Sequence, residues 1–258
     1  MRSCLNPALL VCMAMLLPGF VIAQQPVAEA VALVRQAEQD LAAERGKAAV
    51  EKLQQAARIQ PDWHVPASRL AVLYQAAGMD VAALQQYLVV QLISHNQYQP
   101  NPEKDPALRA ELAETEAYML MQVNAVRARA GLRLLYPHPQ LAVIGRQHAR
   151  EMRDLDYFSH ESPTPARRTI LDRFKLVLPF RPTVLAENLS KRWRTGYGYS
   201  LSLANVRQSH EDLLRSPGHR ANIHRADVID FGIGVASNYK GDYWLAQIFV
   251  DMSGHPEY

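Results

Sequence analysis

Cysteine is nearly absent from this chain of 258 residues, which contains only Cys4 and Cys12. Both lie in an N-terminal segment that we expect to be removed, so the remaining chain would have neither a thiol nor a disulfide. This excludes a cysteine nucleophile and leaves packing to stabilise the fold. The sequence also lacks the Gly-x-Ser-x-Gly elbow of serine hydrolases. The pair His210-Glu211 lacks the second histidine, one helical turn later, that a helical zinc-protease motif requires.

No charge of either sign dominates the sequence. Lysine and arginine number 28, aspartate and glutamate number 25, and the formal net charge is +3. A charge this small predicts no nucleic-acid partner and no anionic membrane surface as a partner. The composition, 48% hydrophobic and 21% charged, is typical of a globular chain with a substantial core, and it excludes wholesale disorder.

Long apolar runs are absent except for residues 8–23, which follow Arg2 and are broken by Pro18-Gly19. This arrangement is typical of a secretory signal peptide, residues 1–23, and we predict cleavage after Ala23. The run is shorter than the ~20 residues that a membrane-spanning helix needs. We therefore expect a mature chain without a transmembrane span, exported to the periplasm or the extracellular space. A retained N-terminal anchor is the alternative.

Residues 24–98 are rich in Ala, Leu, Gln and Glu, and turn signals at Arg45-Gly46, Pro61 and Gly78 divide them into four short helices. Several pairs recur at a spacing of 34 residues: Ala49 with Ala83, Leu53 with Tyr87, and Ala56 with Val90. With Tyr74 and Gly78, this spacing resembles a tetratricopeptide repeat, a structure that would present the protein to a protein partner. An ordinary helical hairpin is the alternative, because Asp40 stands where the first repeat needs an aromatic residue.

Three prolines, Pro100, Pro102 and Pro106, predict a linker at residues 99–109. The remainder, residues 110–258, contains three stretches whose apolar residues step by three and four, as in amphipathic helices. They run from Leu112 to Gly131, from Leu141 to Leu155, and from Leu203 to Ser216-Pro217-Gly218.

The period changes to two near the C-terminus. Phe231, Ile233 and Val235 alternate with Gly232 and Gly234, and after a turn at residues 238–241 a second strand over residues 243–250 has apolar side chains on both faces. A sheet with two apolar faces must be covered on both sides. The sequence therefore predicts helices above and below a C-terminal hairpin.

Several short motifs follow one another in residues 118–251: Val123-Asn124-Ala125-Val126-Arg127-Ala128-Arg129-Ala130-Gly131-Leu132, Gln147-His148-Ala149, Tyr157-Phe158-Ser159-His160-Glu161-Ser162-Pro163, Ala186-Glu187-Asn188-Leu189, Glu211, Ser216-Pro217-Gly218-His219-Arg220-Ala221-Asn222-Ile223, Phe231-Gly232-Ile233-Gly234-Val235 and Gln247-Ile248-Phe249. Together they resemble the CAP superfamily of cysteine-rich secretory and pathogenesis-related proteins, which has disulfide-free bacterial members. The resemblance implies an α+β fold, a three-layer α-β-α sandwich, here preceded by a small all-helical segment. The two-sided hairpin predicts the same layers independently.

The resemblance also implies a cleft in which two histidines and two glutamates meet. These residues correspond to His160, Glu187, Glu211 and His219. Glu211 is matched only by counting back from the Ser-Pro-Gly-His motif, and many relatives have tryptophan where this chain has Leu213. The fourth member of the tetrad is therefore open.

Two imidazoles and two carboxylates suit zinc, with His160 and His219 as ligands, or a pair of metal-free His–Glu hydrogen bonds. The sequence does not separate these alternatives. We interpret His148, which falls on an apolar stripe, as a structural hydrogen-bonding residue. Arg173 and Asn188 are interpreted as scaffolding, because an arginine can fork onto a carboxylate and an amide can hold loop carbonyls.

The resemblance implies a non-catalytic module that binds a lipid, a sterol-like molecule or a cell-envelope component, and no catalytic residue is assigned. A metal-dependent hydrolase is the second hypothesis, with zinc on His160 and His219 and a general base at Glu187 or Glu211. A helical-repeat interaction scaffold is the third. The sequence leaves open whether the protein is an enzyme.

Overall fold

The computed structural model describes residues 25–193, 201–238 and 241–252. The predicted signal peptide lies outside these residues. Within them, no helix has the length and apolarity needed to cross a membrane. The helices are α1 (Ala28–Ala42), α2 (Gly46–Ile59), α3 (His64–Ala76), α4 (Asp80–Ile93), η3 (Ser94–Tyr98), α5 (Pro106–Arg129), α6 (Pro139–Asp154), η4 (Pro165–Arg167), α7 (Ile170–Lys175), α8 (Leu203–Arg215) and α9 (Pro217–Ile223). The strands are β1 (Tyr136–Pro137), β2 (Leu185–Arg192), β3 (Asp230–Ser237) and β4 (Tyr243–Val250).

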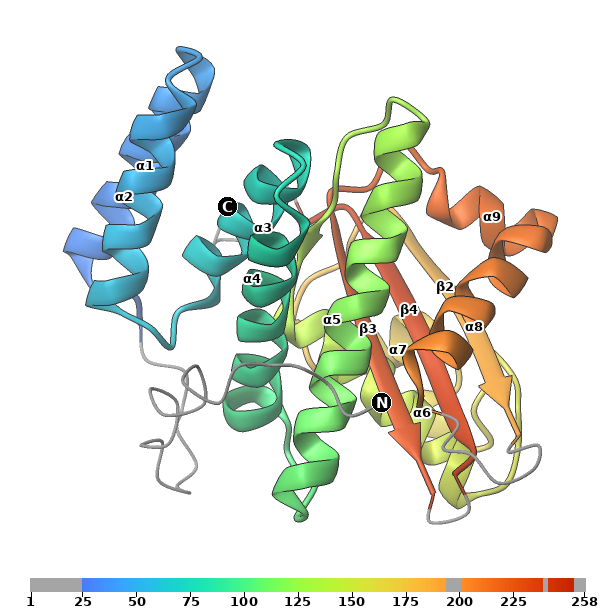
Figure 1. The fold of residues 1–258 in the computed structure, drawn as a ribbon. Helices are drawn as coiled ribbons and strands as arrows, with labels where there is room; N and C mark the ends of the chain where they lie inside the picture. Colours follow the sequence, from blue (N-terminus) through green and yellow to red (C-terminus); the bar gives the residue numbers. More distant parts are fainter. Residues whose placement is uncertain (1–24, 194–200, 239–240, 253–258) are drawn as a thin grey trace.

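The first four helices form two hairpins, α1 with α2 and α3 with α4, and the second hairpin packs on α5 (Figure 1). The residues that recur at the 34-residue spacing, three on α2 and three on α4, are all buried. Gly78 turns the chain between α3 and α4 with a φ of +71°. Asp40 is also buried, and it pairs with Arg45 and Lys52. Four helices are confirmed, and the tetratricopeptide interpretation stays a prediction.

The sheet has the strand order β1-β3-β4-β2, in which β1 and β3 are parallel and the other neighbours are antiparallel. Helix α6 covers one face, with α7 beside it, and α5 and α8 cover the other (Figure 1). The predicted α+β class and three layers are confirmed.

Residues 99–105 contain no helix or strand, and α5 starts at Pro106, inside the predicted linker. The domain boundaries themselves stay predictions.

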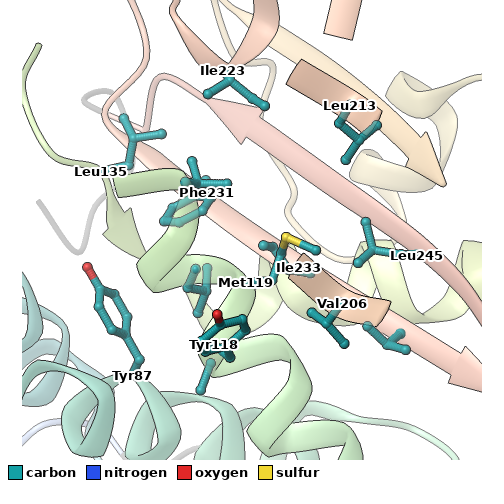
Figure 2. Packing of buried hydrophobic residues seen from close by; sticks show 14 of the residues in the cluster. Tyr87, Tyr118, Met119, Leu135, Val206, Leu213, Ile223, Phe231, Ile233 and Leu245 are labelled. Atoms are coloured by element: carbon teal, nitrogen blue, oxygen red, sulfur yellow. The ribbon is translucent and has the colours of Figure 1, made fainter. Parts of the chain in front are cut away.

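Strand β4 alternates between the two apolar cores of this sandwich. Tyr243, Leu245 and Phe249 pack toward α5 and α8, and Figure 2 shows Leu245 with Met119 and Val206 in this core. Trp244, Ala246, Ile248 and Val250 belong to the core under α6. Both faces of the hairpin are therefore buried, as the continuous apolar pattern predicts.

Helix α6 lies on β3 at backbone contact, because β3 has glycines on that face. A Cβ atom added to Gly234 would lie 1.9 Å from the backbone nitrogen of Arg146, and one added to Gly232 would lie 2.2 Å from that of Ala142. On the helix side, a Cβ added to Gly145 would lie 2.9 Å from the backbone nitrogen of Gly234 on β3 and 2.9 Å from the backbone oxygen of Ala246 on β4. These three glycines set the distance between the helix and the sheet.

A buried charged network joins the N-terminal helices to the sandwich. Glu116 of α5 accepts hydrogen bonds from Arg146 Nε at 2.9 Å and Nη2 at 2.9 Å, and from His95 Nε2 at 3.0 Å. It also accepts one from the backbone nitrogen of Val235 at 3.0 Å, on the edge of β3 that the two-residue β1 leaves uncovered. Burial alone would raise the pKa of Glu116, but Arg146 and His95 outweigh it and lower that pKa to about 2.

The apolar stripes predict α5, α6 and α8, and the structure confirms all three. Helix α5 ends at Arg129, and Gly131 follows with a φ of +68°. Sequence spacing alone does not predict β1, β2, α7 or α9. Helix α8 ends at Arg215, directly before Ser216-Pro217-Gly218, as predicted, and Pro217 is then the first residue of α9. Proline is well tolerated at that position, where its missing N–H has no helical partner.

Substituting Gly234→Ala should destabilise the protein strongly, because the new methyl group meets the backbone of α6 rather than a movable side chain. We expect the free energy of unfolding to fall by about 3 kcal/mol or more, as measured by urea denaturation. Gly218→Ala is the matched control, since its Cβ would meet no atom within 4 Å. A similar loss in both variants would contradict the backbone-contact argument.

His210 makes the stability depend on pH. It is buried on α8, and neither ring nitrogen has a hydrogen-bond partner within the described residues. Burial, with a smaller effect of Arg129, lowers its pKa from 6.5 to about 4. Between pH 4 and pH 6.5, His210 of the unfolded chain binds a proton that His210 of the folded chain does not. The free energy of unfolding should thus be fully retained above pH 6.5 and fall by roughly 3 kcal/mol toward pH 4. Urea denaturation of His210→Phe should give a flatter pH profile than wild type, and parallel profiles would contradict this.

Candidate functional site

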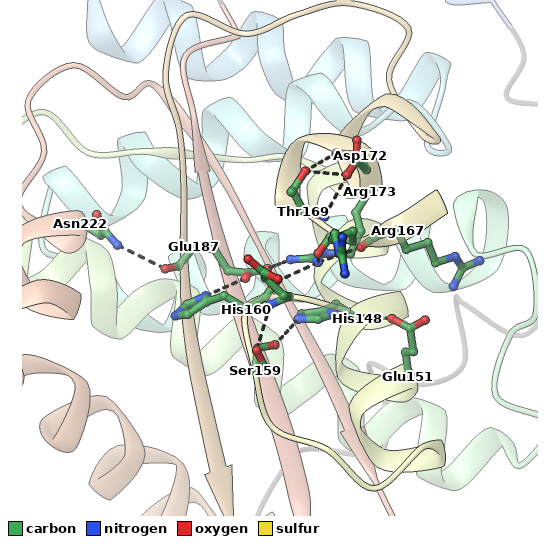
Figure 3. A network of polar contacts seen from close by, with 12 residues as sticks. His148, Glu151, Ser159, His160, Arg167, Thr169, Asp172, Arg173, Glu187 and Asn222 are labelled. Carbon is green, nitrogen blue, oxygen red and sulfur yellow. Dashed lines mark hydrogen bonds and ion pairs between the residues drawn. The ribbon is translucent and has the colours of Figure 1, made fainter. Parts of the chain in front are cut away.

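Glu187 is the centre of the candidate site. It lies on β2 opposite Ile248, and its side chain is only 3% exposed. One carboxylate oxygen, Oε1, accepts a hydrogen bond from Arg173 Nη2 at 2.8 Å. The other, Oε2, lies 2.9 Å from His160 Nδ1. Both oxygens of Glu187 are therefore engaged by cationic or hydrogen-donating groups from the segment before β2, as Figure 3 shows.

Arg173 holds the loop that contains His160. Its Nη1 is within hydrogen-bonding distance of three backbone carbonyls: His160 at 3.1 Å, Arg167 at 3.1 Å and Arg168 at 3.3 Å. The side chain is 3% exposed, and α7, on which it lies, begins with a capping box formed by Thr169 and Asp172. Arg173 therefore holds a carboxylate and a loop, as the scaffolding interpretation predicts, but it reaches Glu187 through Nη2 alone and not as a two-nitrogen fork.

His148 fixes the same loop from the other side. It is fully buried on α6, and its Nε2 lies 3.0 Å from the carbonyl oxygen of Ser159. A carbonyl oxygen can only accept, so Nε2 donates to it. Burial lowers the pKa of His148. Its Nδ1 faces the hydroxyl of Tyr157 at 3.4 Å. His148 is thus a structural hydrogen-bonding residue, as its place on an apolar stripe predicts, and it positions the residue next to His160.

An amide network joins β2 to the segment that contains His219. Asn222 Nδ2 donates to the carbonyl of Glu187 at 3.2 Å and to Asn188 Oδ1 at 2.8 Å. Asn188 Nδ2 in turn donates to the carbonyl of His219 at 3.1 Å and to Gln247 Oε1 at 3.0 Å. Asn188 is therefore scaffolding, as predicted, but the carbonyl that it holds belongs to helix α9 and not to a loop. Asn222, in the Arg-Ala-Asn-Ile part of the quoted motif, is a contact that sequence reasoning did not assign.

The structure brings His160 and Glu187 into contact, and the amide network places the backbone of His219, on α9, beside β2. Burial, and then the charge of His160, lowers the pKa of His219. The side chain of His160 is 58% exposed. These three residues, the edge triad, are separated by up to 59 positions in sequence, and they lie on or beside β2, the outer strand of the sheet.

Glu211 takes no part in this contact network. It lies on α8, its side chain is 45% exposed, and it forms an ion pair with Arg215 one helical turn later at 3.6 Å. In the described part of the chain, no group of three or more His, Cys, Asp or Glu side chains is arranged to hold a metal ion. Zinc on His160 and His219 stays a prediction.

Comparisons with known proteins agree with this architecture. The family model described as the cysteine-rich secretory protein family, CAP, matches residues 120–250, just over half of the sequence. The chain belongs to the CAP family. The matched residues contain the whole edge triad and all four strands. No curated protein matches the sequence significantly.

Two solved structures are similar to this CAP protein. An extracellular protein from Bacillus anthracis that contains an SCP domain is 24% identical, with 58% of this chain covered and a TM-score of 0.47. This chain spans only 45% of that protein. An outer surface protein from Borrelia burgdorferi is 12% identical, with 52% of this chain and 89% of the other covered and a TM-score of 0.42.

Replacing Arg173→Met should expose its positioning role. It leaves the buried Glu187 carboxylate without its counter-ion and releases three loop carbonyls, so we expect the free energy of unfolding to fall by ~3–5 kcal/mol. Imidazole 15N NMR should show that His160 Nδ1 loses its hydrogen bond or changes its environment. Arg173→Lys restores the charge, but its single nitrogen cannot reach both Glu187 and the loop carbonyls as the two guanidinium nitrogens do. This variant should therefore recover only part of the stability.

Arg168→Met is the control, because this neighbouring arginine is exposed. It should leave both the stability and the His160 signals unchanged. Wild-type signals in Arg173→Met would contradict the positioning role.

Proposed function

We propose that this CAP-domain protein is an exported binding protein and that its ligand contacts the imidazoles of His160 and His219. The observation that carries the proposal is the state of Glu187. Its two oxygens are occupied by Arg173 and His160, and its side chain is buried. A carboxylate held in this way orients an imidazole and is not free to take a proton from an incoming water.

The hydrogen bond to Glu187 also sets what His160 offers to a ligand. The carboxylate can only accept, so Nδ1 carries the proton and the neutral ring presents Nε2 as an acceptor. More than half of this side chain is exposed. A ligand with a hydroxyl or N–H donor would complement this nitrogen.

An exposed apolar side chain lies in the same loop as His160. Phe158, two residues before His160, is 49% exposed. An imidazole acceptor in a loop with an exposed aromatic side chain suits an amphiphile with a hydroxyl-bearing head, such as a sterol-like molecule or an envelope lipid. This supports the lipid-binding hypothesis over the hydrolase.

The same geometry bears on zinc. His160 and His219 would supply two ring nitrogens, and zinc sites use three or four protein ligands. Glu187, the carboxylate nearest to them, is already bound to Arg173, and Glu211 pairs with Arg215. The described residues therefore fit zinc poorly, and we derive no step through a metal.

Native mass spectrometry of the protein purified from its host tests the proposal. We expect a co-purified amphiphile at up to one molecule per chain, which should be absent from His160→Asn because that variant loses the Nε2 acceptor. His224→Asn is the control, since His224 is half-buried and its Nδ1 contacts only the carbonyl of Arg220 within the same turn among the described hydrogen bonds. The control should retain the ligand.

The same spectra report metal content. Stoichiometric zinc, together with a hydrolytic turnover that His219→Ala abolishes, would replace the binding proposal by the hydrolase. Equal ligand retention in wild type and His160→Asn would place the binding site elsewhere on the protein.

A further inference from the structure

A cavity of about 600 Å³ lies outside the edge triad. Its walls are the linker from Gln99 to Lys104, the C-terminal half of α6 from Gln147 onward, and Arg167. Cavities of ~300–1,000 Å³ are typical of small-molecule sites. Neither the family comparison nor the edge triad accounts for this cavity.

A row of three arginines runs along α6 beside the cavity, and their partners differ. Arg146 pairs with Glu116 at 2.9 Å, and Arg153 pairs with Asp154 at 2.7 Å. Arg150, between them, forms no ion pair with any carboxylate in the described part of the chain. Its Nη1 donates to the carbonyl of Asn101, while its enclosed Nη2 has no hydrogen-bond partner there. A donor left without a partner at a cavity wall indicates that a water or a ligand oxygen completes it.

The acidic residues of the cavity wall are already satisfied. Glu151 accepts a hydrogen bond from the hydroxyl of Tyr157 at 2.9 Å, and Asp154 pairs with Arg153. Glu103 accepts hydrogen bonds from two backbone nitrogens of its own turn, at Lys104 and Asp105. These hydrogen bonds leave the carboxylates negatively charged, and Glu151 and Glu103 act electrostatically on Arg167 and Arg150, respectively.

Two further cations face the same cavity without an ion-pair partner among the described residues, namely Lys104 and Arg167. Four basic side chains line the cavity, Lys104, Arg150, Arg153 and Arg167, against three carboxylates, Glu103, Glu151 and Asp154, so one positive charge is in excess. The carbonyls at the end of α6 offset part of it. Burial, and then the charges of Arg146 and Arg153, lowers the pKa of Arg150, whereas Glu103 and Glu116 act in the opposite direction. An anion would relieve the mutual repulsion of the basic side chains.

The cavity is held open by specific contacts rather than by loose packing. Arg146 Nη1 donates to Gln99 Oε1 at 3.0 Å, and Arg150 Nη1 donates to the carbonyl of Asn101, so α6 fixes the linker at two points. Arg153 Nη1 is fixed by the carbonyl of Ser237 at 2.9 Å. Figure 3 shows Arg167 extending away from His160, on the side of Glu151.

We propose that this linker cavity binds a small polyvalent oxyanion, a carboxylate or phosphate compound, through Arg150, Lys104 and Arg167. Guanidinium groups match such anions with paired N–H donors. The site is separate from the one in the proposed function, so either can be wrong without the other.

Isothermal titration calorimetry of the purified protein with pyrophosphate and with citrate tests the proposal, with acetate as the monovalent comparison. At low ionic strength at least one polyvalent anion should bind with one-to-one stoichiometry, and more tightly than acetate. Arg150→Gln and Arg167→Gln should each weaken that binding by about tenfold or more. Pyrophosphate preferred over citrate would indicate a phosphate ligand, and the reverse a carboxylate.

Arg35→Gln is the matched control, because it removes the same charge from an exposed position on α1. It should bind as wild type does, as should His160→Asn. Arg150→Gln could weaken binding by releasing the linker, because Arg150 donates to the carbonyl of Asn101. Arg167→Gln removes a positive charge from the cavity without removing a described hydrogen bond to the linker, so it separates the two effects. The proposal is overturned if neither anion binds, or if Arg35→Gln weakens binding as much as the two cavity variants.

Discussion

The fold depends on the backbone contact between α6 and β3. Gly232 and Gly234 leave no side chain between the strand and the helix, and Gly145 does the same from the helix side. The helix thus has a fixed distance and position relative to the sheet, which a layer of ordinary side chains would set less closely. Every functional group on α6 takes its place from this contact, from Arg146 at one end of the row to Arg153 at the other.

Helix α6 then organises three neighbouring parts of the protein. His148 holds the carbonyl next to His160, Arg146 binds Glu116 and Gln99, and Arg150 binds the linker at Asn101. The Glu116–Arg146 pair is fully buried, and such a pair adds little net stability over an apolar one. Its larger effect is on specificity. A displaced α5 or α6 would leave these charges unpaired in the interior, so the network favours one arrangement of the N-terminal helices on the sandwich.

Periodicity predicts the elements whose buried faces are apolar, and it fails where polar residues are buried. Helices α5, α6 and α8 and the hairpin of β3 and β4 follow from sequence spacing alone. Strand β2 does not, because its buried positions include Glu187 and Asn188, which the sequence gives no reason to place inside. The family resemblance supplied His160, Glu187 and His219 as candidates. It could not supply the loop clamp by Arg173, which depends on how α7 folds back on β2, and it included Glu211, which the contact network leaves out.

The edge triad and the linker cavity share one loop but use different parts of it. The carbonyl of Arg167 is held by Arg173, while its side chain lines the cavity. A ligand that contacts the Arg167 side chain can therefore bind without displacing the backbone that positions His160. Arg173 spreads its hydrogen bonds over three loop carbonyls and over Glu187, and moving any one of them would strain the other contacts. Energetic coupling between two sites requires an element with two arrangements, and a loop fixed at this many points has one. The two sites should consequently act independently, and a protein with this architecture can hold two chemically different ligands on a single sandwich.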